Sequence, residues 1–192
     1  MSLSAYVAAF KNTPHALYPL GAGLLITSSM LFGNIGLSLA GPLPIITEKL
    51  GDSTLGTKQK IRVWRLFYDA ATPFIVGGTL ATVALHGGAV YLTKNVTVKQ
   101  LATASAVLSG IVLPFTLAFI MPINKALIYL DEKDISKSES RQARALIKQW
   151  DVLHKARFIF YGTGWLLSLA AIGVGLHKRV DAKGLVTGSW FA

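Results

Sequence analysis

The sequence contains no cysteine, and it has few charged residues for its length. The lack of cysteine excludes disulfides, thiolate nucleophiles, thiolate zinc sites and iron–sulfur ligation. Charged residues make up 15% and hydrophobic residues 52% of the 192 residues, and the mean hydropathy is +0.50. This composition favours an integral membrane protein over a soluble one.

Four long stretches lack Asp, Glu, Lys and Arg altogether, namely 12–47, 70–93, 100–124 and 158–177. A helix needs about 20 residues to cross the hydrocarbon of a bilayer, so each stretch is long enough. No alternating pattern indicates a β-barrel, which is the other structure that satisfies its backbone in lipid. We therefore predict an all-α, integral membrane four-helix bundle, a single domain over 1–192. Its expected spans are about 16–40, 70–93, 100–124 and 158–177.

The first stretch does not resemble a cleavable signal sequence. It is longer than a signal core, only one basic residue precedes it, and it ends in Gly-Pro-Leu-Pro instead of a small-residue cleavage site. We expect it to remain as the first span.

Basic residues are concentrated in two of the loops. Five lie between the first and second stretches and eight between the third and fourth. The positive-inside rule then predicts that both loops are cytoplasmic and both termini non-cytoplasmic. The endoplasmic reticulum is one membrane that suits this orientation, and the sequon at Asn95 falls in a loop that this topology places on the non-cytoplasmic side. Segments 58–69 and 139–157 lack Gly and Pro, so we expect the helices to extend on the cytoplasmic side.

The formal charge of +10 has two readings. Because so much of the chain lies in the bilayer, a basic rim facing anionic lipid headgroups accounts for it better than nucleic acid does. We expect the lipid bilayer as a partner and no nucleic acid.

The last span carries an unusual stripe of side chains. Trp150, His154, Arg157 and Tyr161 fall at i, i+4, i+7 and i+11 of one helix face. Two interpretations remain open. The aromatic residues could anchor the helix at the interface while Arg157 reaches the phosphates, or the stripe could line a pocket.

A second group lies at the start of the second span, and a lone amide ends the third. Trp64, Arg65, Tyr68 and Asp69 include a possible ion pair at i, i+4, with an ordinary boundary pair and aromatic belt as the alternative. Asn124 follows Pro122, which interrupts regular helix hydrogen bonding, so its amide is free to point toward a pocket.

Metal and nucleotide chemistry have weaker support. A site built from His15, His86 and His177 is geometrically conceivable, but these residues lack metal-ligand spacing and a nearby carboxylate. No catalytic-triad order, phosphate-binding loop or dinucleotide fingerprint is present. We predict no metal ligands.

Four motifs together resemble one family. They are Trp64-Arg65-x-x-Tyr68 leading to Pro73, Pro114-Phe115-Thr116, Met121-Pro122-Ile123-Asn124-x-x-Leu127, and Trp150-x-x-Leu153-His154-x-x-Arg157. This pattern resembles the anthrone oxygenase-like family of small four-span membrane proteins over roughly 21–175. The family usually has Pro-Thr-Asn where this chain has Pro-Ile-Asn, and that departure keeps Asn124 in place.

The resemblance implies a function and a set of roles. It implies a membrane-embedded oxygenase, a monooxygenase that oxidises an anthrone-like aromatic polyketide of secondary metabolism to a quinone with molecular oxygen. His154 would be the base, and Arg157 and Asn124 would stabilise the anionic oxygen. The implied substrate-binding residues are Trp64, Arg65, Tyr68, Trp150 and Tyr161. No cofactor beyond the co-substrate oxygen is expected, although use of a metal and assembly as a homo-oligomer stay open.

Two alternatives belong to other classes. A non-catalytic membrane protein that binds a lipophilic ligand or scaffolds a pathway enzyme would have the same aromatic residues. A transporter is less well supported, because the predicted spans contain no carboxylate for coupling.

Overall fold

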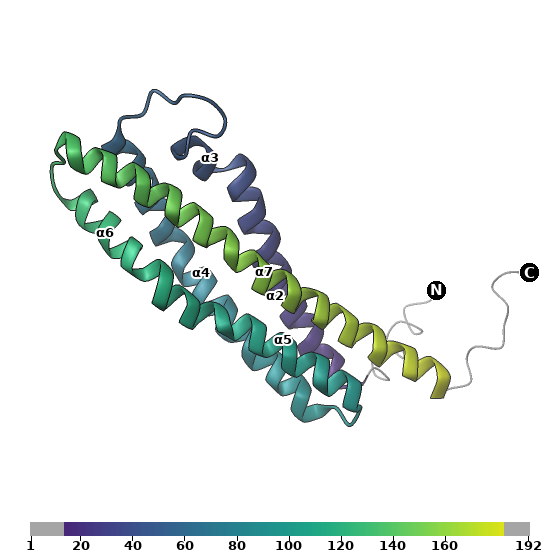
Figure 1. Cartoon of the computed structure of the whole chain (residues 1–192). Coiled ribbons are helices and arrows are strands. Elements are labelled where there is room, and N and C mark those ends of the chain that lie inside the picture. The colour runs from purple at the N-terminus through teal and green to yellow at the C-terminus, as the bar shows by residue number, and fades with distance from the viewer. Residues whose placement is uncertain (1–13, 183–192) are drawn as a thin grey trace, which may run out of the picture.

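The computed structural model describes residues 14–182, and this part of the chain is helical without a strand. The elements are α2 (Leu17–Ala40), α3 (Pro42–Ile46), α4 (Thr57–Leu92), α5 (Val96–Phe115), η1 (Thr116–Ile120), α6 (Met121–Glu132) and α7 (Lys137–Ala182). They form four long rods, because α3 continues α2 after a bend and α5, η1 and α6 run on from one another (Figure 1).

Each rod is long and apolar enough to cross a membrane. The four candidate spans are Leu17–Ile46, Thr57–Leu92, Val96–Glu132 and Lys137–His177. Large apolar side chains such as Leu25, Phe32 and Leu80 are exposed on the outside of the bundle, as expected where lipid replaces water. The prediction of an all-α, multi-pass membrane bundle is confirmed. The expected spans overlap these longer helices, which extend beyond most of the predicted ends.

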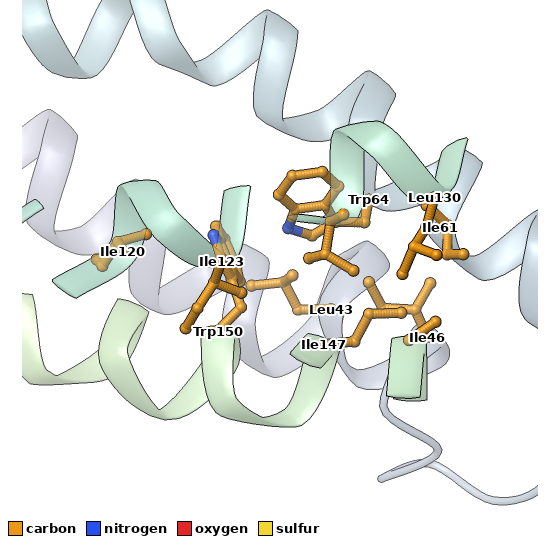
Figure 2. Packing of buried hydrophobic residues seen from close by; sticks show 11 residues of the cluster. Leu43, Ile46, Ile61, Trp64, Ile120, Ile123, Leu130, Ile147 and Trp150 are labelled. Carbon is orange, nitrogen blue, oxygen red and sulfur yellow. The ribbon is translucent and has the colours of Figure 1, made fainter. Parts of the chain in front are cut away.

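One end of the bundle holds the largest apolar cluster. Leu43 of α3, Trp64 of α4, Leu127 of α6 and Trp150 of α7 belong to it, and Figure 2 shows Leu43, Trp64 and Trp150 among the side chains gathered between the helices. The helix extensions predicted for 58–69 and 139–157 lie at this end. It is the end that the charge pattern predicts to be cytoplasmic.

Ion pairs attach the loop after α3 to this end of the bundle. Glu48 pairs with the buried Lys60 of α4, and Lys49 pairs with the buried Asp151 of α7. The hydrogen bond from Lys60 lowers the pKa of the Glu48 carboxyl, and the hydrogen bond to Asp151 raises the pKa of Lys49. These pairs satisfy charges that would otherwise be buried without a partner.

The third rod changes its helical geometry between two prolines. Pro114 lies in α5 and Pro122 in the first turn of α6, and the five residues between these helices form the π-helix η1, in which the amide of Met121 donates to the carbonyl of Thr116. Pro122 has no N–H, and its ring crowds the carbonyl four residues earlier, so the regular hydrogen-bond ladder cannot continue there. π-helical turns frequently mark functional sites, and this one borders the cavity described next.

Candidate active site

A cavity of about 270 Å³ lies between α2, α4, the α5–η1–α6 rod and α7. It shares Ile120 and Trp150 with the cluster of Figure 2. Its volume is near the lower end of the range of roughly 300–1,000 Å³ that is usual for small-molecule pockets. Most of the lining is aliphatic or aromatic. The polar and polar-tipped side chains are those of Asn34, Tyr68, Thr72, Thr116, Asn124, Trp150, His154 and Arg157.

The side-chain stripe predicted on the last span lies on α7 and supplies the imidazole and the guanidinium of the lining. His154 and Arg157 are 1% and 8% exposed, and Nη2 of Arg157 donates a hydrogen bond to Nδ1 of His154. The indole of Trp150 stacks on the imidazole with ring centroids 4.7 Å apart and planes 12° from parallel. The ring of Phe158 packs edge-on against the imidazole, with ring centroids 5.1 Å apart. These contacts hold the imidazole in one orientation.

Asn124 reaches the cavity from the first turn of α6, just after the π-helix. Its Oδ1 accepts a 2.8 Å hydrogen bond from Nε1 of the Trp150 indole. Because this bond identifies the amide oxygen, the NH₂ group is the end that remains. Among residues 14–182 that NH₂ group has no hydrogen-bond partner, so it is available to donate to a ligand.

We predict that Trp150→Phe lowers the free energy of unfolding by about 1–3 kcal/mol, because it leaves the buried amide oxygen of Asn124 unpaired. The double variant Trp150→Phe/Asn124→Leu should recover most of that loss, since removing both partners leaves no orphaned group. Thermal unfolding in detergent measures both. A double variant less stable than the single one would contradict this reading of the bond.

Five of the eight predicted site residues line the cavity, namely Tyr68, Asn124, Trp150, His154 and Arg157. Trp64, Arg65 and Tyr161 are not part of its lining. Trp64 is fully buried behind it, stacked on Tyr68 with ring centroids 5.2 Å apart. Arg65 instead pairs with Asp69 at 2.7 Å, as the i, i+4 spacing indicates.

Tyr161 lies one turn deeper in the bundle. Its hydroxyl is 2.9 Å from Oγ1 of Thr79 on α4, and the side chain is 1% exposed. Tyr161 therefore joins α7 to α4 by a buried hydrogen bond, a structural role that the sequence pattern did not separate from substrate binding.

Several lining residues were not predicted from the sequence. Asn34 of α2 is 6% exposed and its amide donates to the carbonyl of Met30. Thr116 belongs to η1, and its buried hydroxyl has no partner among the described residues. Asn34 could have been found as a polar residue within a span, which is costly in lipid unless it has a partner or a function. Nothing in the sequence shows that Thr116 would face inward.

A second histidine is buried near the opposite end of the bundle, outside this cavity. Nδ1 of His86 is 3.1 Å from Oγ of Ser105, and its Nε2 is 3.2 Å from Oγ of Ser168. Both ring nitrogens are thus occupied by serines. Within residues 14–182 no group of three or more His, Cys, Asp or Glu side chains gathers as a metal site.

The polar end of the cavity carries a cation without a matching anion. No Asp or Glu lines it. Asp151, one turn before His154, is bonded to Lys49 and to Lys155, and no ion pair in the described chain includes Arg157. The electrostatics of the site therefore favour a negatively charged group on a ligand.

The fold and the site together define a four-span membrane protein with a small, mostly apolar cavity that ends in an Arg–His pair. The model of the anthrone oxygenase family matches residues 64–167, more than half of the chain. The protein belongs to this family. No curated protein and no solved structure matches the chain.

Proposed function

We propose that the protein oxidises an anthrone-like aromatic polyketide to the corresponding quinone with molecular oxygen. The observation that carries the proposal is the Arg157–His154 pair at the end of an apolar cavity, stacked against Trp150, in a member of the anthrone oxygenase family. A flat polycycle with one carbonyl oxygen matches this combination of an apolar body and a cationic tip.

The substrate itself can supply all the electrons. Loss of a proton from the methylene carbon opposite the carbonyl gives an anion delocalised onto the ring oxygen. This anion transfers an electron to dioxygen, and the two radicals combine into a carbon–oxygen bond, giving a peroxide. Loss of the second proton from that carbon, with cleavage of the O–O bond, yields the new carbonyl and hydroxide. The sum is anthrone plus dioxygen to quinone plus water, with both sides balanced.

The cavity supports this reaction at the substrate oxygen. Arg157 and the free NH₂ group of Asn124 would stabilise negative charge in a water-poor site, where such interactions are strongest. Tyr68 and Trp150 offer aromatic surfaces to the ring system. To act as the predicted base, His154 needs a free lone pair on one of its ring nitrogens. One of these two nitrogens, Nδ1, already accepts a hydrogen bond from Arg157.

The same cavity offers an apolar substrate a route from the bilayer. Val76 of α4 and Leu117 of η1 line it, yet they are 40% and 63% exposed on the outside of the bundle. The cavity therefore reaches the lipid-facing surface between these helices. A hydrophobic polycycle dissolved in the membrane could enter there without crossing water.

Isotope labelling tests the proposed reaction. The purified protein in detergent or nanodiscs is given emodin anthrone under ¹⁸O₂, and quinone formation is followed by absorbance and mass spectrometry. We expect a rate above the spontaneous one and one ¹⁸O atom in the new carbonyl. Ligand binding without accelerated oxidation would refute the oxygenase and favour the non-catalytic binder, and a chelator-treated sample tests whether a metal contributes.

A further inference from the structure

We propose that the cavity binds its ligand as an oxyanion and that His154 takes part as a hydrogen-bond donor through Nε2, not as a base. The inference deepens the proposed function and rests on it for the identity of the natural ligand. The anion preference itself rests on the charges and hydrogen bonds of the cavity.

The bond between Arg157 and His154 fixes which ring nitrogen carries the proton. A guanidinium has N–H donors and no acceptor, so Nδ1 of His154 must accept with its lone pair. In the neutral ring the proton is then on Nε2. A lone pair able to take a proton from a substrate is left on neither nitrogen while this bond is in place.

Nε2 of His154 is a buried donor in need of an acceptor. It has no hydrogen-bond partner within the described chain, and the same is true of Nε of Arg157. Both residues line the cavity. Leaving a buried donor unpaired is unfavourable, and an oxygen anion in the cavity would satisfy these donors together.

The other polar groups around the Arg157–His154 pair add hydrogen-bond donors and no unpaired carboxylate. Thr116 and the NH₂ group of Asn124 are further donors without partners in residues 14–182, and Tyr161 near Arg157 is bonded to Thr79. Asp151 is held by two lysines, as described above. The cavity thus presents one cation and several donors, which is the arrangement of an oxyanion site.

This assignment changes the origin of catalysis. The methylene C–H bond breaks, its electron pair moves onto the ring oxygen, and its proton passes to water or hydroxide, not to His154. The protein favours this ionisation by stabilising the oxyanion, so the acidity of the bound ligand increases. An opposite charge at this range typically shifts an acid by about 1–3 pKa units.

A non-oxidisable dye measures the preference directly. We would titrate 2-hydroxyanthraquinone, whose visible absorption moves to longer wavelength on ionisation, with the full-length protein in nanodiscs. The expected result is a pKa of the bound dye lowered by about one unit or more relative to dye in empty nanodiscs. Arg157→Met should abolish the shift, and Arg144→Met, an exposed arginine of α7 that donates to Thr57, should leave it unchanged.

Two substitutions of His154 distinguish its role as a hydrogen-bond donor from a role as a base. His154→Gln keeps an N–H donor near the position of Nε2 but cannot act as a base, whereas His154→Ala removes both abilities. We expect His154→Gln to retain the dye shift and to oxidise anthrone within about tenfold of the wild type, and His154→Ala to lose about 100-fold or more.

The proposal would be overturned if the pKa of the dye were not lowered on binding to the wild-type protein. It would also be overturned if the His154→Gln variant kept the dye shift but were as inactive as His154→Ala. An acid shift in a protein that does not accelerate oxidation would contradict the oxygenase and still support the oxyanion site. Failure of the one is therefore distinguishable from failure of the other.

Discussion

Arg157→Met should lower the rate of quinone formation by about 100- to 1,000-fold, which is the usual effect of removing one donor from an oxyanion site. Arg157 is the cationic residue that lines the cavity, and it also sets the tautomer of His154. Its loss removes the charge that stabilises the substrate anion and frees Nδ1 of the histidine. Steady-state kinetics with emodin anthrone, corrected for spontaneous oxidation, measure the effect.

The folded state should tolerate this substitution. No carboxylate pairs with Arg157 in the described chain, so the substitution removes an uncompensated buried charge, and this gain offsets the loss of the hydrogen bond to Nδ1 of His154. An unchanged or raised melting temperature would show that activity was not lost by unfolding. Arg144→Met should keep wild-type activity. If Arg157→Met also keeps it, the cavity does not stabilise a reacting anion.

Gly23→Ala should destabilise the protein by about 1–3 kcal/mol, the usual cost of overpacking a core. A Cβ on Gly23 of α2 would lie 2.5 Å from Nε2 and 2.7 Å from Cδ2 of His86 on α4. The imidazole is fully buried and bonded to Ser105 and Ser168 on two other rods. It cannot move aside without breaking those bonds, so α2 and α4 must separate.

Gly21→Ala provides the matched control, because a Cβ there meets nothing within 4 Å. It should be neutral, or stabilising by up to about 1 kcal/mol through the higher helix propensity of alanine. Thermal unfolding of both variants in the same detergent tests the pair. Equal melting temperatures for Gly23→Ala and the wild type would contradict the close approach of α2 and α4.

The membrane spans could be predicted from the sequence because absence of charge over a helix-spanning length is a local property. The rods are longer than the predicted spans: α4 begins at Thr57 and α7 at Lys137, well before the charge-free stretches. Helix propensity indicated these extensions in 58–69 and 139–157. The short helix Pro42–Ile46 was not predicted, because its Gly-Pro-Leu-Pro context reads as the end of a helix.

Part of the site could also be predicted, because the spacing of residues along one helix is a local property of the sequence. His154 and Arg157 share one helix face, and fixed spacing brings Trp150 to the same side. Spacing does not reveal which neighbouring helix a face meets. Trp64 and Tyr68 are one turn apart, yet Tyr68 lines the cavity and Trp64 packs in the core behind it. The Arg157–His154 bond depends on side-chain conformation, which sequence does not specify.

Filling the cavity is the most direct test of the claim that the oxidation takes place there. Ala71 of α4 lines the cavity, whereas the preceding Ala70 faces outward and does not. The measurement is the rate of quinone formation from emodin anthrone by the wild type, Ala71→Trp and Ala70→Trp. We predict that the wild type and Ala70→Trp exceed the spontaneous rate while Ala71→Trp does not. An Ala71→Trp variant as fast as the wild type, or a wild type no faster than the spontaneous reaction, would contradict the account.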